Sequence, residues 1–254
     1  MKRVRKILLT VVTVVLAACL IGLVITGWKI GWGPFTFLQF NEQQNAITEK
    51  YDSKSRQGEI IFYGASNFRL WMEMENDLSG YKVQNHGFGG STDKDLAERA
   101  DVLLYPYAPK IVFFQTGSND YVSIEGTDEE KVAQCMAYKA QMFDTFRAQL
   151  PDAHFVVMSG LLLPGRSQYT ALTQMVNDEL QKYCEEHAAY MTFVDAEAMT
   201  YADCAYRTEL FIEDGIHLNR DGQLEWCRDY IAPQIEKLIE ELGAEELRRQ
   251  ETTE

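Results

Sequence analysis

The sequence is short of basic side chains. Its 254 residues carry 24 Lys and Arg against 38 Asp and Glu, which gives a formal net charge of -14 and an isoelectric point near 4.8. A nucleic-acid-binding protein is expected to present a basic face, so this balance argues against that class of function. An acidic body is also repelled by anionic lipid headgroups, so any membrane contact is expected at the amino terminus.

Metal-binding patterns are missing as well. The chain has four histidines and five cysteines, and no pair of them has the spacing of a zinc site. Cys135, Cys184 and Cys227 fall in predicted helices, where buried free thiols are expected, although the four cysteines beyond Cys19 also allow two disulfides. The sequence predicts neither a metal nor a cofactor.

The sequence shows no internal repeats. Two common loop motifs are present only in incomplete form. Residues 87–92 follow a predicted strand and open a helix, as a dinucleotide-binding loop does, but Thr92 replaces its third glycine. The G-x-S-x-G elbow of α/β-hydrolases would need glycine at position 68, where Phe68 stands. Both of these site types are therefore excluded.

The amino terminus differs sharply from the rest of the chain. Four of the first six residues are basic, and residues 7–28 form a 22-residue segment without charge. A membrane-spanning helix needs about 20 apolar residues, and a basic segment before it predicts a cytoplasmic amino terminus and an exported body. We expect an uncleaved anchor here. A cleaved signal peptide and a lipoprotein processed at Cys19 are the alternatives, and both also export the body.

The remaining chain alternates between strand and helix patterns. A polar connector with a short helix at 40–51 occupies residues 29–58, and residues 243–254 form a charged tail that is expected to fray. Strands are predicted at 59–63, 81–85, 111–115, 154–158 and 191–194. The main helices are predicted at 93–104, 128–150, 169–186 and 220–242. Repeated strand–helix units with apolar strands predict a parallel sheet covered on both faces.

Sites in such sheets gather at the carboxyl ends of the strands. Ser66 follows the first strand where a helix begins, and Asn67 is expected only to start that helix. His217 lies in a loop before the last helix with Asp214 three residues upstream, a spacing that lets a carboxylate meet the ring. Taken alone, this Asp-x-x-His pattern favours an ordinary surface loop.

The apolar residues 161–164 follow the fourth predicted strand. They fit either an acyl-chain wall or a buried strand extension.

Four loops taken together resemble the SGNH hydrolase family, also called GDSL esterases and lipases. The matching blocks follow the family's order and read G-A-S at 64–66, N-x-G-x-x-G at 85–90, G-x-N-D at 117–120 and D-x-x-H at 214–217. One position departs from the family pattern, because Ala65 stands where the name motif has Asp.

The resemblance implies a role for each matching residue. Ser66 corresponds to the nucleophile, His217 to the general base and then acid, and Asp214 to the residue that orients His217. The oxyanion hole corresponds to the backbone N–H groups of Ser66 and Gly90 with the side-chain amide of Asn119.

Two further residues of these blocks, His86 and Asp120, carry expectations of their own. His86 lies beside the oxyanion loop and is a candidate substrate contact, with a structural role as the favoured alternative. Asp120 is expected to brace its own loop.

Pattern and resemblance together predict one three-layer α/β/α domain at residues 59–242. Its sheet is expected to be five-stranded, parallel and flavodoxin-like, after a cytoplasmic stub at 1–6, the transmembrane anchor at 7–28 and the connector at 29–58. The predicted function is an extracytoplasmic serine esterase, held in the cell membrane, that cleaves an acetylated glycan or a lipid ester. An acyltransferase acting on an envelope polymer and a non-catalytic envelope-binding protein are the alternatives.

Overall fold

The computed structural model describes residues 10, 12–22, 24–25 and 35–249, in two units divided between Ala46 and Ile47. In the first unit, the described residues before 26 are helical. The helix α2 (Phe35–Lys50) begins in this unit and ends in the second. No helix among the described residues is both long and apolar enough to cross a membrane. The predicted stub at 1–6 lies outside the described residues, as do parts of the predicted anchor at 7–28.

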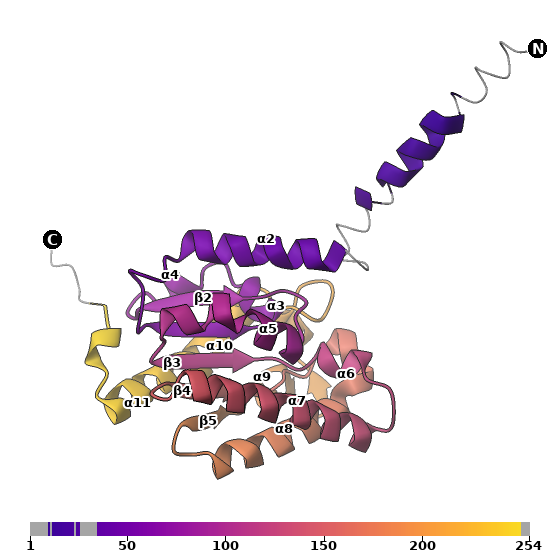
Figure 1. The fold of residues 1–254 in the computed structure, drawn as a ribbon. Helices are drawn as coiled ribbons and strands as arrows, with labels where there is room; N and C mark the ends of the chain where they lie inside the picture. The colour runs from indigo at the N-terminus through magenta and orange to yellow at the C-terminus, as the bar shows by residue number, and fades with distance from the viewer. Residues whose placement is uncertain (1–9, 11, 23, 26–34, 250–254) are drawn as a thin grey trace, which may run out of the picture. The chain divides into compact units, whose positions relative to one another are not determined.

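The second unit is built on a five-stranded parallel sheet, as predicted. The strands pair in the order β2-β1-β3-β4-β5, which is the flavodoxin-like order (Figure 1). Their bounds are β1 Ile60–Gly64, β2 Val83–Gly87, β3 Ile111–Gln115, β4 His154–Met158 and β5 Met191–Val194. In the register of this sheet Gly64 lies between Gly87 and Gln115, so the first three strands end together at one edge.

Helices cover both faces of the sheet and make the three layers of the predicted fold (Figure 1). The helices are α3 Ser66–Arg69, α4 Met74–Asp77, α5 Asp93–Leu103, α6 Asp120–Ser123, α7 Asp128–Gln149, α8 Thr170–Glu186, α9 Glu197–Thr200, α10 Arg220–Trp226 and α11 Ala232–Leu242. A short hairpin of β6 (Tyr201–Ala202) and β7 (Ala205–Tyr206) follows α9.

Alternating strand residues supply the core on each face. Phe62 and Phe113 stack on one face with ring centroids 4.8 Å apart and pack with the α3, α10 and α11 side chains. On the other face Phe114 stacks on Phe146 of α7 at 5.7 Å. Because side chains alternate between the two faces of a strand, the run of aromatic residues in β3 serves both layers.

The second strand begins two residues later than predicted. Tyr81 bridges to Arg248, and the Lys82 N–H donates to the Leu247 carbonyl at 2.8 Å. Tyr81 and the Lys82 N–H therefore bond to the segment after α11, while the Lys82 carbonyl still accepts the Ile60 N–H of β1 at 3.0 Å. The tail was expected to fray from residue 243 onward, and for residues 243–249 this was wrong. Ala244 and Leu247 are buried in the core.

The last predicted helix is interrupted. Residues Cys227–Ile231 form a π-helical turn between α10 and α11. Pro233 stands in the first turn of α11 and has no N–H with which to continue the regular bonding of the preceding turn. The wider π turn accommodates this missing donor.

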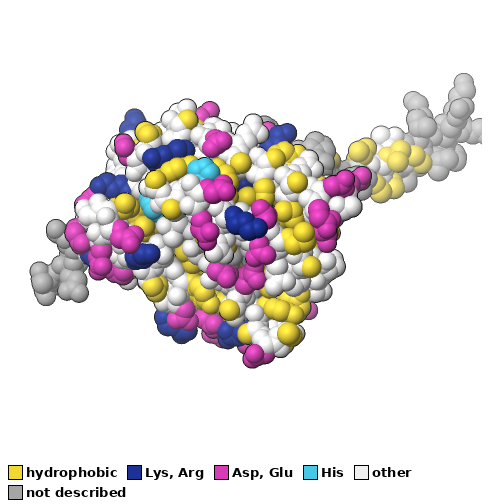
Figure 2. Space-filling model, turned by 90° about the horizontal axis from the view of Figure 1, so that it is seen from below, with side chains coloured by type: hydrophobic (Ala, Val, Ile, Leu, Met, Phe, Trp, Pro, Cys, Tyr) yellow, Lys and Arg dark blue, Asp and Glu magenta, His cyan; other side chains and the backbone are white. Residues whose placement is uncertain are grey.

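On the face of the molecule shown in Figure 2, acidic side chains of the described residues are spread widely. Basic side chains stand between them in small, separate groups. This distribution follows from the excess of acidic residues in the sequence.

Candidate active site

Ser66 is presented by a sharp turn from β1 into α3. The Ala65 N–H donates to the Gln115 carbonyl at 3.0 Å, and Ala65 has extended geometry as the N-cap of α3. A Cβ at Gly64 would lie 2.5 Å from the same carbonyl oxygen, so only glycine fits between the strands there. Ser66 is the first residue of α3 and is half-buried. Its N–H is thus one of the helix donors without an intrahelical acceptor.

The structure places Ser66, His217 and Asp214 in one hydrogen-bonded chain. Nε2 of His217 lies 2.8 Å from Oγ of Ser66, and Nδ1 lies 2.6 Å from Oδ2 of Asp214. A carboxylate only accepts, so Nδ1 carries a proton and Nε2 is left to accept the serine proton. A basic nitrogen at this distance is suited to deprotonate the hydroxyl group.

The Asp214 carboxylate is held as an anion by its own turn. Oδ1 accepts the N–H groups of Ile216 at 2.8 Å and His217 at 3.0 Å, and Gly215 provides the left-handed residue with φ of 63°. Partial burial alone would raise the pKa of Asp214, but these N–H groups and the imidazole lower it below the usual range. Asp214 is therefore ready to stabilise an imidazolium.

Asn67 ties the serine turn to the histidine loop. Its Oδ1 accepts the Leu218 N–H at 3.1 Å across a separation of 151 residues. The side chain is buried, so this bond fixes the loop next to His217. The sequence suggested only a helix start at Asn67, because the partner is a backbone group that no motif identifies.

The expected oxyanion residues come from three adjacent loops. Gly90 has a φ of 80°, a conformation that favours glycine. The Asn119 side-chain amide donates to the Ser91 carbonyl at 2.9 Å, which links the Asn119 loop to the residue after Gly90. Oδ1 of Asn119 accepts from Nη2 of Arg166 at 3.1 Å, and no motif had pointed to Arg166.

His86 does not face a substrate site. It is fully buried, with Nδ1 2.6 Å from the Leu103 carbonyl and its ring packed at 4.5 Å against Tyr107. Burial lowers the pKa of His86 to about 4, so it stays neutral near pH 7. Its position fits the structural role that the sequence favoured, and not the alternative of a substrate contact.

A buried charged cluster lies behind the oxyanion loops, made of Asp93, Asp120 and Lys139. Nζ of Lys139 contacts Oδ2 of Asp93 at 3.0 Å and donates to Oγ1 of Thr116 at 2.6 Å. The Asp93 N–H donates to Asp120 Oδ1 at 3.0 Å. The Asp120 carboxyl group therefore bonds to the start of α5, whereas the sequence had led us to expect a bond within its own loop.

Asp120 has an unusual acidity because of this setting. Burial first, and the neighbouring Asp93 charge second, raise the pKa of Asp120 to about 7, against the opposing influence of Lys139. Burial alone would lower the pKa of Lys139, but the two carboxyl groups raise it above its usual value. The cluster thus holds a firm ammonium and one carboxyl group that binds a proton near neutral pH.

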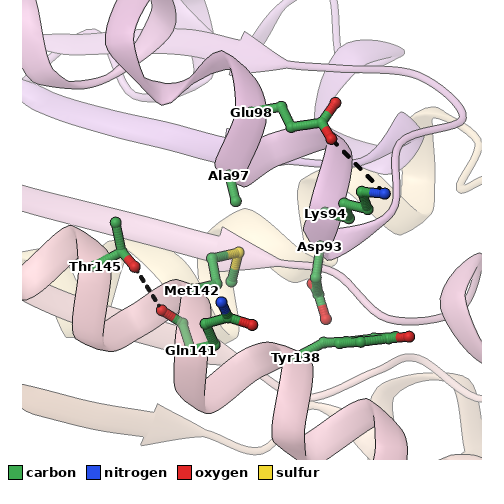
Figure 3. Close-up of a pocket in the computed structure, with 8 residues that line it drawn as sticks. All are labelled: Asp93, Lys94, Ala97, Glu98, Tyr138, Gln141, Met142 and Thr145. Carbon is green, nitrogen blue, oxygen red and sulfur yellow. Dashed lines mark hydrogen bonds and ion pairs between the residues drawn. The ribbon is translucent and has the colours of Figure 1, made fainter.

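A groove of about 340 Å³ between α5 and α7 reaches the cluster from outside (Figure 3). Figure 3 shows Asp93 at the start of α5, with Tyr138, Gln141 and Met142 facing it from α7. Neither Ser66 nor His217 lines this groove. Within the described ranges no group of His, Cys, Asp and Glu side chains is arranged to hold a metal ion.

A model of the GDSL-like lipase/acylhydrolase family matches residues 45–224 of the chain. No curated protein matches this chain. A candidate platelet activating factor from Streptococcus pneumonia is 18% identical with a TM-score of 0.63, covering 75% of this chain and 91% of that one. A GDSL-like lipase from Bacteroides thetaiotaomicron is also 18% identical, with a TM-score of 0.57 and coverages of 79% and 97%.

A carbohydrate esterase family 3 protein from Talaromyces cellulolyticus is 17% identical with a TM-score of 0.53, covering 73% of this chain and 99% of that one. At these identities the solved structures show a shared fold. The family model spans more than half of the chain and carries the assignment. The chain belongs to the GDSL-like lipase/acylhydrolase family and is an ester-hydrolysing enzyme of the SGNH type.

Proposed function

We propose that this enzyme hydrolyses a carboxylic ester through an acyl-enzyme on Ser66. The observation that carries the proposal is the chain of hydrogen bonds from Ser66 through His217 to Asp214, at 2.8 and 2.6 Å. Nucleophile, base and orienting group are each within direct reach of the next.

In the first half-reaction, Oγ of Ser66 attacks the ester carbonyl carbon while Nε2 of His217 takes the hydroxyl proton. Negative charge collects on the carbonyl oxygen, where the N–H groups of Ser66 and Gly90 and the Asn119 amide are proposed to bind it. The imidazolium then protonates the leaving alcohol oxygen as the C–O bond breaks. Asp214 stabilises the imidazolium through Nδ1.

In the second half-reaction, a water molecule takes the place of the alcohol. His217 removes its proton, the hydroxide oxygen adds to the acyl carbon, and Ser66 leaves with the proton returned by His217. The side chains of His217 and Asp214 are 22% and 39% exposed, so water reaches this site readily. That access favours hydrolysis over acyl transfer to another alcohol.

We propose a short acyl group, such as acetyl on a glycan, in preference to a long lipid chain. The apolar segment that looked suited to an acyl chain is unavailable, because Leu161, Leu162 and Leu163 are buried in the core. The basic amino terminus and the uncharged residues 7–28 support a membrane-held, extracytoplasmic enzyme.

The deciding experiment compares Ser66→Ala with Ser79→Ala, a matched change at an exposed serine outside the site. We expect Ser66→Ala to lose at least about 10³-fold in kcat/KM on p-nitrophenyl acetate and to lose fluorophosphonate labelling. Ser79→Ala keeps both. Retained turnover in Ser66→Ala rules out the mechanism.

A series of p-nitrophenyl esters from acetyl to decanoyl tests the acyl preference, and kcat/KM is expected to fall with chain length. An added alcohol acceptor tests transfer. Hydrolysis predicts free acid as the main product, whereas mostly transesterified product would favour the acyltransferase.

A further inference from the structure

Arg166 reaches from the loop after β4 to the loop that holds Asn119. Its Nη1 donates to the Ser118 carbonyl at 2.6 Å and to the Ser118 hydroxyl at 3.0 Å. Its Nη2 donates to Oδ1 of Asn119 at 3.1 Å. One guanidinium therefore binds two successive residues of the G-x-N-D block, including the expected oxyanion donor.

The backbone next to Arg166 is fixed against the acid–base loop. The Gly165 N–H donates to the Gly215 carbonyl at 2.8 Å. A Cβ at Gly165 would lie 2.2 Å from the Asp214 carbonyl oxygen, so no larger residue fits there without a shift. Arg166 thus starts from a point anchored beside Asp214 and ends on Asn119.

This geometry decides which way the Asn119 amide faces. The two ends of a carboxamide have nearly the same shape, so packing alone does not distinguish them. A guanidinium only donates and does not lose its proton, so only Oδ1 of Asn119 fits against Arg166. The NH₂ group is then turned to the other side, where one N–H donates to the Ser91 carbonyl at 2.9 Å. The second N–H is the one that the proposed mechanism assigns to the substrate oxygen.

The positive charge also acts on the amide itself. A cationic donor on Oδ1 withdraws electron density and makes the amide N–H groups stronger donors. The benefit grows as charge develops on the substrate oxygen, because the amide then binds an anion. Arg166 therefore favours the transition state more than the bound ester.

We propose that Arg166 is a positioning residue of the oxyanion hole, which holds and polarises the Asn119 amide. This role rests on the proposed acyl-enzyme mechanism at Ser66. It does not require Arg166 to touch the substrate.

The test is a double-mutant cycle between Arg166→Met and Asn119→Ala, with kcat and KM measured on p-nitrophenyl acetate. Removing one oxyanion donor typically lowers kcat by about 10²–10³-fold. We expect Arg166→Met to lower kcat by about 10–100-fold with little change in KM, and to cost less than about 3-fold when Asn119 is already alanine. Arg166→Lys, which keeps one charge without the fork, should fall between wild type and Arg166→Met.

Arg147→Met is the matched control. Arg147 is also half-buried and donates to a backbone carbonyl, that of Ala153, but it lies on α7 away from these loops. Its kcat should stay at the wild-type value. If Arg166→Met does not fold, the cycle is run with Arg166→Lys, for which the same loss of effect in the Asn119→Ala background is expected.

Three results would overturn the proposal. Equal losses with and without Asn119 would mean that Arg166 does not act through that amide. A raised KM at unchanged kcat would make Arg166 a substrate-binding group, and wild-type kinetics in Arg166→Met would leave it no role. Failure of the underlying mechanism would look different, since Ser66→Ala would then remain active.

Discussion

Two aspartates at the same edge of the sheet have opposite acidities. Asp214 is 39% exposed and accepts two backbone N–H groups and an imidazole, which together lower its pKa. Asp120 is 3% exposed, accepts one backbone N–H and faces Asp93, and its pKa rises to about 7. The difference lies in the partners and the water around each carboxyl group, since the side chains are the same.

This contrast separates a chemical role from a structural one. A carboxylate that orients a catalytic imidazole must stay ionised throughout the reaction, and the Asp214 turn provides for that. A carboxyl group that titrates near pH 7 is unsuited to this task. Asp120 instead joins the two oxyanion loops through its bond to the Asp93 N–H.

The largest effect expected from this contrast is on turnover. Asp214→Asn removes the charge that stabilises the imidazolium and allows the wrong imidazole tautomer, so kcat should fall by about 10²–10⁴-fold. Asp120→Asn keeps a group that accepts the Asp93 N–H, so kcat should fall by less than about 10-fold. Steady-state kinetics of both variants on one ester checks this. Equal losses would contradict the division of roles.

The next effect is on stability and concerns Lys139. Lys139→Met removes the only ammonium that contacts Asp93 among the described residues and leaves that carboxylate buried without its partner. Loss of one member of a buried pair typically costs about 3–5 kcal/mol. We expect such a decrease in the free energy of unfolding measured with urea.

A second substitution tests the cause of that decrease. Asp93→Asn removes the uncompensated charge, so Lys139→Met/Asp93→Asn should recover part of the lost stability. A double variant less stable than Lys139→Met would argue against charge burial as the cause.

The sequence predicted the bounds of a strand or helix closely where the local residues alone determine them. The bounds of β3, β4 and β5 were predicted to the residue, because short apolar runs stood between clear turn signals. The α7 helix begins at residue 128 as predicted, directly after Thr127, which forms a capping box with Glu130. The π turn before Pro233 and the docking of Leu247 beside Lys82 depend on tertiary contacts, and the local pattern did not contain them.

The same limit applies to the site. Ser66, Asp214 and His217 carried a signal because each stands in a short motif next to a strand end or a helix start. Asn67 and Arg166 carried none, because their partners are 151 and 47 residues away and include backbone carbonyl or N–H groups. For His86 the motif left two roles open, since a position beside a motif does not tell whether the side chain is buried.

The smallest effect is the pH dependence of stability that Asp120 should produce. The folded protein holds a proton on Asp120 up to about pH 7, whereas the unfolded chain releases it near the ordinary value of 3.8. The stabilisation is therefore fully present below that ordinary value and is lost as the pH rises through about 7. Between these two pH values, the wild-type free energy of unfolding should fall with rising pH relative to that of Asp120→Asn. The expected slope is up to about 1.4 kcal/mol per pH unit.

Urea unfolding of wild type and Asp120→Asn from about pH 5 to pH 8 measures this difference. Asp101→Asn, at an exposed carboxylate on α5, is the control and should show no such slope. The difference should level off above about pH 8, where Asp120 is ionised in both states. A wild-type protein that instead gained stability over this range, relative to Asp120→Asn, would place Asp120 with Asp214 among the carboxylates held as anions. The contrast between the two aspartates would then fail.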